Sequence, residues 1–198
     1  MQNIQSALQS ANLAGKVKVS TAIDSGFIAN SFPPSNGVFS SSTYMNPIIN
    51  FLRNNGSPLL VNIYPYLAYT GTPGINLNYA LFTSPGTVVT DSNNGLQYQN
   101  LFDALVDAVY AALARAGTPQ MEIVVSESGW PSAGGNETTI SNAGTYYRNL
   151  MRTSRKRGQA IETYLFAMFD ENLKSAGVEQ HFGIFTPNQQ PKYQLNFS

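Results

Sequence analysis

The sequence predicts an α/β fold in which helices cover a sheet of parallel strands. Segments with the spacing of amphipathic helices alternate with short apolar segments along all 198 residues. Segment 59–64 is hydrophobic at nearly every position, which is typical of a strand buried on both faces. One helix between successive strands makes those strands parallel. Four such strands can form an open doubly wound sheet or part of a barrel. No glycine-rich turn follows the first strand, which disfavours a nucleotide-binding sheet.

The first half of the chain contains two of these helix–strand units. Apolar residues at helical spacing predict a helix over 1–13, which Gly15 ends. Alternating apolar residues predict a strand over 17–23. A second apolar stripe predicts a helix over 44–55, and the strand over 59–64 follows it. Each strand therefore comes directly after a helix.

The second half repeats this order after a long loop. Segment 65–96 is too long for a plain connector, so we expect a binding role or small extra elements in it. The apolar face of 101–116 predicts the clearest helix of the chain. A strand over 122–126, a helix over 139–157 and a strand over 161–169 are expected after it.

Composition and charge exclude several classes of function. The chain has 11 lysines and arginines against 11 aspartates and glutamates, so it offers no general attraction to nucleic acid or an anionic membrane. No apolar run has the length of a membrane-spanning helix. The absence of cysteine excludes thiolate chemistry, and a single histidine, His181, is more often structural than catalytic. We therefore expect neither nucleic acid nor a membrane as a partner.

Glu127 is the most informative residue of the sequence. The apolar residues 123–125 deliver it to a turn rich in glycine and proline, as a parallel barrel presents a catalytic group at the carboxyl end of a strand. The other strand ends carry Asp24, the Tyr64-Pro-Tyr66 segment and Asp170-Glu171. Carboxylates beside aromatic rings fit glycoside hydrolysis. By position alone, a structural loop or capping carboxylate remains an alternative reading of Glu127.

Six segments closely resemble plant glycoside hydrolase family 17, the β-1,3-glucanases. They occur in the family's order and span nearly the whole chain: Val17–Asp24, Val61–Tyr66, Tyr79–Phe82, Ser126–Gly135, Phe166–Asn172 and Phe182–Phe185. The resemblance implies a retaining endo-glycosidase that acts on β-1,3-glucan and is built on a (β/α)8 barrel. Residues 1–198 would form a single domain that supplies strands five to eight, a parallel half-barrel.

The resemblance also implies roles for individual charged residues. The Glu of the Ser-Glu-Ser-Gly-Trp-Pro segment, Glu127, would be the nucleophile. Glu171, Lys174 and Glu179 match the active-site groups that follow the last strand, and Lys174 would keep Glu171 ionised and oriented. The alternative for these three is a solvated cluster of loop charges. Carboxylate chemistry of this kind requires neither a cofactor nor a metal.

Aromatic residues near the strand ends are candidates for binding sugar rings. Tyr64, Tyr66 and Trp130 are the main candidates, and Tyr79 and Phe82 are further ones. For each ring, packing in the core is as good an interpretation as contact with a ligand.

The second carboxyl group that a retaining enzyme needs is missing from this pattern. In the family the acid/base is a Glu in a Gly-Asn-Glu type motif at the end of the fourth strand, whereas Asn136-Glu137 follows the nucleophile turn and resembles no strand end. Segment 1–13 resembles the helix after that strand. We therefore expect the chain to begin just past the acid and to be weakly active or inactive alone.

Three further expectations accompany this interpretation. A non-catalytic β-glucan-binding remnant and a mixed-linkage 1,3-1,4-glucanase are the alternative functions. The open edges near 17–23 and 164–169 predict possible self-association. The resemblance implies an extracellular or vacuolar family, although the first residues lack the basic region and apolar core of a signal peptide, so the location of this chain stays open.

Overall fold

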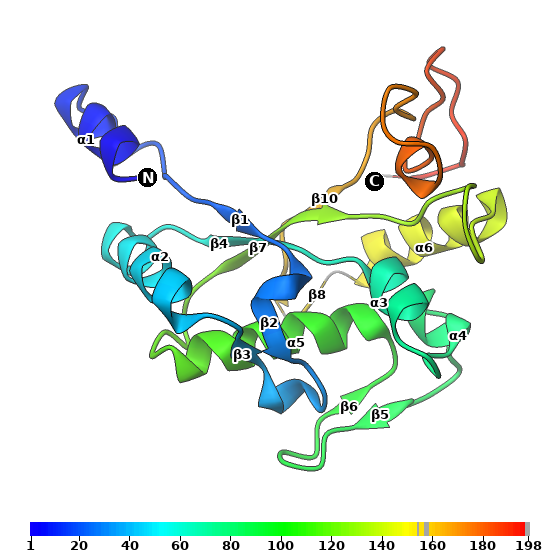
Figure 1. Ribbon diagram of the computed structural model, residues 1–198, viewed down its shortest axis with the longest axis horizontal. Coiled ribbons are helices and arrows are strands. Elements are labelled where there is room, and N and C mark those ends of the chain that lie inside the picture. The colour runs from blue at the N-terminus through cyan, green and yellow to red at the C-terminus, as the bar shows by residue number, and fades with distance from the viewer. Residues whose placement is uncertain (154, 157–158, 197–198) are drawn as a thin grey trace.

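A parallel four-stranded sheet forms the centre of the computed structural model, which describes residues 1–153, 155–156 and 159–196 (Figure 1). In their order across the sheet, its strands are β1 (Ala22–Ile23), β4 (Leu59–Asn62), β7 (Ile123–Ser128) and β10 (Thr163–Leu165). Each strand pairs with the one that precedes it in this order. A doubly wound sheet reverses its strand order at a switch point, so this arrangement is that of part of a barrel.

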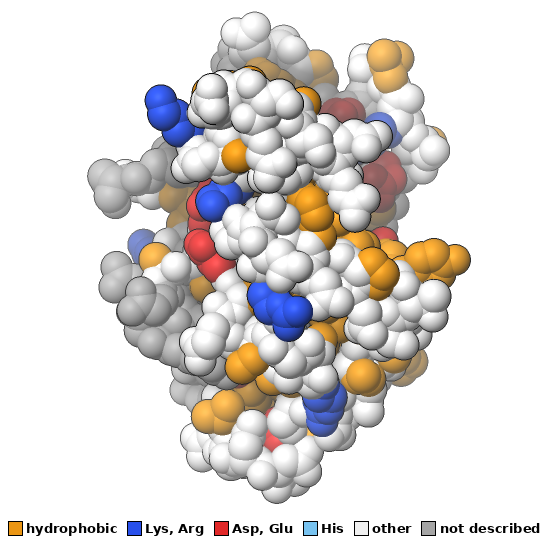
Figure 2. Space-filling model, turned by 90° about the vertical axis from the view of Figure 1, so that its left-hand side faces the viewer, with side chains coloured by type: hydrophobic (Ala, Val, Ile, Leu, Met, Phe, Trp, Pro, Cys, Tyr) orange, Lys and Arg blue, Asp and Glu red, His pale blue; other side chains and the backbone are white. Residues whose placement is uncertain are grey.

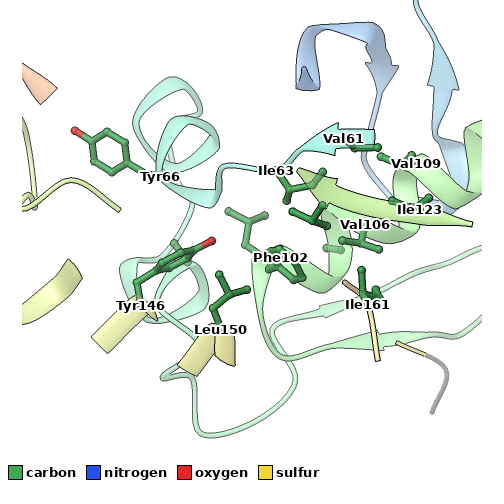
Figure 3. Close-up of a cluster of buried hydrophobic side chains, with 14 of the residues drawn as sticks. Val61, Ile63, Tyr66, Phe102, Val106, Val109, Ile123, Tyr146, Leu150 and Ile161 are labelled. Carbon is green, nitrogen blue, oxygen red and sulfur yellow. The ribbon is translucent and has the colours of Figure 1, made fainter. Parts of the chain in front are cut away.

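Helices alternate with these strands along the chain. They are α1 (Gln2–Ser10), α2 (Ser42–Asn55), α5 (Leu101–Arg115) and α6 (Ile140–Thr153). The core lies between the sheet and the helices, where Val61 and Ile123 of the strands lie beside Val106 and Val109 of α5 (Figure 3). By contrast, α1 has no buried residue and extends away from the sheet (Figure 1).

Local sequence explains where α5 begins and where α5 and α2 end. The Asn100 side chain accepts a hydrogen bond of 2.8 Å from the Asp103 amide, which satisfies a free amide at the start of α5. Gly117, with φ of +77°, follows α5, and Gly56, with φ of +57°, ends α2. Glycine adopts this left-handed conformation without steric cost.

A β-bulge decides which side chains reach the functional edge of the sheet. Val61 pairs with Val125, but Asn62 pairs with Glu127, so Ser126 is an extra residue in β7. As a result Ser126 contacts Asn62, and Glu127 contacts Tyr64. Tyr64 follows Asn62 by two residues, so both side chains point to the same side of the sheet. The sequence predicted that this strand would end at 126. In the structure it continues to Ser128, so Glu127 lies within its last residues.

Other predicted boundaries also change. The strand predicted over 17–23 is reduced to Ala22–Ile23, and the one predicted over 161–169 is reduced to Thr163–Leu165, with an isolated parallel bridge from Phe169 to Phe185. Residues 166–169 leave the ladder with β7 after the hydrogen bond from the Phe166 amide to the Ser128 carbonyl, and they hydrogen-bond to the 182–185 segment instead. The helix predicted over 139–157 ends at Thr153, and its predicted residues 154 and 157 lie outside the described ranges.

The loop 65–96 contains the small extra elements that its length predicted. These are the short helices α3 (Pro65–Gly71) and α4 (Leu77–Ala80) and the strand β5 (Val89–Thr90), which pairs with β6 (Gln97–Tyr98). Further elements are the pairs β2 (Ile28–Asn30) with β3 (Val38–Phe39) and β8 (Arg155–Lys156) with β9 (Gln159–Ala160), and 3₁₀ turns at Ser25–Phe27, Pro34–Asn36 and Val178–Gln180.

The surface carries few charges of either sign. On the side of α1 and α2, Lys, Arg, Asp and Glu side chains are scattered among neutral ones (Figure 2). This agrees with the equal numbers of basic and acidic residues in the sequence. Among the described residues, no helix is both long and apolar enough to span a bilayer.

Candidate active site

Glu127 lies half-buried at the carboxyl end of β7, and a neighbouring strand orients its carboxylate. The Tyr64 hydroxyl, which follows β4, donates a hydrogen bond of 2.8 Å to Oε2 of Glu127. Among the described residues this is the one hydrogen bond to the carboxylate, so its Oε1 oxygen is available to a ligand. A carboxylate that is fixed at one oxygen and open at the other is suited to nucleophilic attack.

The surroundings of Tyr64 keep its hydroxyl protonated. Its ring packs edge-to-face against Phe166 and Phe182, with ring centroids 6.0 and 5.8 Å apart. Burial, followed by the hydrogen bond and charge of Glu127 and by smaller contributions from Tyr147 and Glu179, raises the pKa of the phenol far above its usual value. Tyr64 is therefore a permanent hydrogen-bond donor near neutral pH.

A polar pair beside Glu127 is not among the sequence-predicted residues. The Ser126 hydroxyl donates a hydrogen bond of 2.7 Å to Oδ1 of Asn62, and both side chains are half-buried. The sequence offered one signal for this pair, because Asn62 interrupts an otherwise apolar strand. The rings of Phe166 and Phe182 were likewise missed as supports of Tyr64, since an apolar residue in a strand or loop does not reveal which ring it will contact.

The structure brings the predicted loop charges to the same edge of the sheet. Nζ of Lys174 lies 2.7 Å from Oε2 of Glu171, and both side chains are substantially exposed. The same ammonium group lies 4.6 Å from the centroid of the Phe166 ring, which in turn supports Tyr64. Glu179 is exposed in the Val178–Gln180 turn, and its charge acts on Tyr64. The candidate site is therefore formed by Glu127, Tyr64 and these loop charges.

Tyr66 and Trp130 are buried, whereas a ring that binds sugar must be exposed to the ligand. Tyr66 is 3% exposed and Trp130 is completely buried, and their rings meet edge-to-face at 5.1 Å. The Trp130 Nε1–H group donates to the Glu137 carbonyl, so its polar atom is also satisfied within the protein. Their burial favours core packing, the alternative interpretation of these two rings. Tyr79, which is 4% exposed, belongs to the core for the same reason.

Two loops meet behind the candidate site. A Cβ atom at Gly134, in the turn after β7, would lie only 2.5 Å from the Gly177 carbonyl carbon. The Ser132 amide also donates a hydrogen bond of 3.0 Å to the His181 carbonyl. Glycine is required at 134 by this close approach and by its φ of +91°. The turn that follows the Glu127 strand therefore supports the segment that carries Glu171, Lys174 and Glu179.

The described residues contain no group of three or more His, Cys, Asp and Glu side chains arranged to hold a metal ion. A hollow of about 810 Å³ between α6, β10 and the C-terminal segment, lined by Arg148, Ile161 and Leu165 among others, contains none of the predicted site residues. The chemistry available at the sheet edge is that of carboxylates, a phenol and an ammonium group.

Comparison with known families decides the assignment of this arrangement. The model for glycosyl hydrolases family 17 matches residues 1–197. The chain belongs to this family. The family resemblance predicted from the sequence is thereby confirmed.

Curated family 17 relatives cover the chain completely. A glucan endo-1,3-beta-glucosidase of Vitis vinifera is 59% identical over 207 residues, which are 100% of this chain and 59% of the relative. The basic vacuolar isoform GLB of Nicotiana tabacum is 54% identical over 100% of this chain and 55% of the relative. The chain thus spans somewhat more than half the length of these relatives.

Solved structures of family 17 proteins confirm the predicted fold class. CJP38, a beta-1,3-glucanase and allergen of Cryptomeria japonica pollen, matches with a TM-score of 0.92 and 47% identity over 100% of this chain and 64% of that chain. A structure from a study of two plant beta-glucan endohydrolases with distinct substrate specificities matches with a TM-score of 0.92 and 45% identity over 100% of this chain and 66% of that chain. The described chain is a partial (β/α) barrel of this family.

Proposed function

We propose that the chain supplies the nucleophile side of a retaining endo-hydrolase for β-1,3-glucan. The observation that supports this most directly is the 2.8 Å hydrogen bond from Tyr64 to Glu127 at the carboxyl end of a barrel strand. The relatives from Vitis vinifera and Nicotiana tabacum are named glucan endo-1,3-beta-glucosidases, which supports the substrate class. In this proposal residues 1–198 form a single domain with strands five to eight of the barrel.

The proposed role of Glu127 is covalent. Its free Oε1 oxygen attacks the anomeric carbon as the glycosidic C–O bond breaks, and a glycosyl-enzyme ester forms. Water then hydrolyses that ester with overall retention. Tyr64 holds the other carboxylate oxygen throughout, so the attacking oxygen keeps one orientation. Glu171, Lys174 and Glu179 contact the bound glucan from the loop side of the site.

The leaving oxygen also needs a proton, and the Gly-Asn-Glu segment of this sequence, residues 135–137, follows the turn after β7 and does not stand at a strand end. A retaining site holds its second carboxyl group about 5–5.5 Å from the nucleophile. Glu171 is paired with Lys174, so one of its carboxylate oxygens is already held in an ion pair. We propose that the chain alone turns over slowly, because leaving-group protonation contributes about 10²–10⁴-fold in rate.

The test is reducing-sugar release from laminarin by the purified chain, beside a Glu127→Gln variant. We expect slow release that the variant abolishes, while both proteins bind laminari-oligosaccharides equally. Binding by both without any release would instead support a non-catalytic glucan-binding role. Release that survives in the variant would exclude Glu127 as nucleophile. Faster release from mixed-linkage 1,3-1,4-glucan than from laminarin would contradict the proposed linkage.

The open sheet edges support a proposal about assembly. In the described part of the chain, β1 and β10 each lack a neighbour on one side. Val17, Tyr164 and Met168 near these edges are 46%, 56% and 63% exposed. Such edges pair readily with other strands, so we expect association of the isolated chain, which light scattering across a concentration series would detect. A strictly monomeric protein would contradict this expectation.

A vacuolar or extracellular location is the proposal that the relatives support. Two tobacco relatives are named as basic vacuolar isoforms. Localisation of the tagged protein in plant cells tests it, and a cytosolic signal would contradict it.

A further inference from the structure

A buried ion pair closes the base of the loop that carries the three predicted site charges. This loop, residues 171–180, begins after Asp170 and returns at His181. Nζ of Lys192, in the C-terminal segment, lies 2.6 Å from Oδ1 of Asp170. The two side chains are only 6% and 15% exposed, respectively. The same ammonium group also donates a hydrogen bond of 3.3 Å to the His181 carbonyl, so Lys192 contacts both ends of the 171–180 loop.

Asp170 also connects the start of the 171–180 loop to the segment that follows the loop. Its Oδ1 oxygen accepts a hydrogen bond of 2.9 Å from the Gly183 amide, and its own amide donates to the Phe185 carbonyl. A Cβ atom at Gly183 would lie 2.0 Å from the Asp170 nitrogen, so the chain segments touch directly at this point. The carboxylate is therefore the common acceptor for one ammonium group and one backbone amide.

The rest of the 171–180 loop has weaker connections to the protein. The Glu171–Lys174 pair is exposed, and exposed pairs contribute little to stability. The Gln180 side chain donates to the carbonyls of Asn172 and Lys174, which are within the loop itself. The contact of Gly134 with Gly177 touches one point of the loop. The Lys174 ammonium group lies over the Phe166 ring at 4.6 Å from its centroid. Among the described residues, the buried pair is the ion pair that connects the two ends of this loop to the rest of the protein.

We propose that Lys192 is a positioning residue that acts through Asp170 to fix the 171–180 loop, and with it the placement of Glu171, Lys174 and Glu179. The assignment of these three residues to the glucan site rests on the proposed function, whereas the restraint on the loop does not. Removal of one partner of a buried pair leaves an uncompensated charge, which is strongly destabilising. Replacement of both partners together is often nearly neutral.

Hydrogen–deuterium exchange of the purified chain tests the restraint without any need for activity. In Lys192→Met, we expect amides in peptides that span 171–183 to exchange at least about tenfold faster, because local opening governs exchange. Peptides of α5 (Leu101–Arg115) should be unchanged. In the double variant Asp170→Asn/Lys192→Met most of the protection should return, since the asparagine still accepts from Gly183 and no buried charge is left alone.

Lys18→Met is the matched control, because Lys18 is an exposed lysine that donates to a single carbonyl, that of Asn55. It should leave loop exchange unchanged. If Lys192→Met does not fold, Asp170→Asn replaces it, since this variant strands the buried ammonium group and should also accelerate loop exchange. Unchanged loop exchange in the folded single variant, or a double variant with no recovery, would overturn the proposal.

Binding of laminaripentaose, measured by calorimetry, separates this proposal from the proposed function. Weaker binding by Lys192→Met, about tenfold, with recovery in the double variant, would link the loop to the ligand. Accelerated loop exchange in a chain whose wild type binds no laminaripentaose would support the restraint and count against the glucan site. Binding of laminaripentaose by the wild type, together with unchanged loop exchange in Lys192→Met, would support the glucan site and count against the restraint.

Discussion

The two halves of the candidate site are held in different ways. Glu127 and Tyr64 belong to adjacent strand ends, are half-buried, and are joined by a 2.8 Å hydrogen bond. Glu171 and Lys174 belong to the 171–180 loop and are 43% and 36% exposed. The sheet register places the nucleophile candidate, Glu127. The loop charges depend instead on the proposed restraint by the Asp170–Lys192 pair. Substitutions at the strand ends should therefore lower the rate of turnover, and substitutions in the loop should weaken the binding of substrate.

The largest difference in turnover is expected between the Glu127→Gln and Glu171→Gln variants. Loss of a nucleophile lowers turnover by several orders of magnitude, whereas loss of one exposed loop charge should change it far less. Initial rates of laminarin hydrolysis by the two purified variants check this. Equal losses would break the comparison, since they would place both carboxylates in the reaction itself.

A smaller effect is expected for Tyr64→Phe, which removes the hydrogen bond to Glu127 and keeps the ring. A hydrogen bond to a charged group contributes about 1.5–3 kcal/mol, so kcat should fall about tenfold to a hundredfold with little change in KM. Steady-state kinetics measure this, with Tyr44→Phe, an exposed tyrosine on α2, as the control. A rise in KM alone would show that Tyr64 binds substrate and does not orient the carboxylate.

Alkaline pH should destabilise the protein through buried tyrosines that lie outside the 171–180 loop, which contains no tyrosine. Burial raises the pKa of Tyr79 and Tyr146, and that of Tyr193 to about 12. Below about pH 10 both folded and unfolded chains keep these protons, so the free energy of unfolding is constant. Above it the unfolded chain releases protons that the folded chain retains, and stability falls by roughly 1.4 kcal/mol per pH unit for each such phenol.

Denaturant titrations between pH 8 and 11.5, followed by circular dichroism, measure this slope. Tyr146→Phe should make the slope shallower because it removes one of the buried phenols. A constant free energy of unfolding up to pH 11.5 would contradict the prediction.

The smallest effect is expected for Lys174→Met. Its pair with Glu171 is exposed, and such pairs contribute about 0–1 kcal/mol, so the midpoint of unfolding should hardly move. A modest rise in KM for laminari-oligosaccharides is the expected functional change. A loss of stability comparable to that of Lys192→Met would remove the distinction between the exposed and the buried pair.

Local patterns in the sequence indicate where Glu127 and Tyr64 lie relative to the strands. The apolar residues before Glu127 and the Tyr64-Pro-Tyr66 segment indicated which strand ends carry polar groups, and the structure brings Glu127 and Tyr64 together. The bulge at Ser126 was not predicted, because pairing register depends on the neighbouring strand. Strand 17–23 was predicted too long for a related reason: its apolar spacing indicates a strand but not whether a neighbour is there to pair with it.

Long-range contacts account for the other differences. Nothing in the local sequence of Asp170 or Lys192 indicates their buried pair, since the partners lie 22 positions apart and belong to polar segments. The burial of Tyr66 and Trp130 likewise cannot be read from the local sequence. Aromatic residues after a strand suit both a cleft and a core, and only the packing of α3, α6 and the turn after β7 around them decides that they are buried.

Trp130 gives the chain an internal optical reporter. It is the single tryptophan of the sequence, it is fully shielded from water, and the rings of Tyr66, Tyr69 and Tyr146 lie 5.1, 6.0 and 5.6 Å away. Light absorbed by these tyrosines should therefore be emitted by the indole at short wavelength, out of reach of aqueous quenchers. The colour and yield of that emission would report on the packing three residues beyond Glu127 without any label attached to the protein.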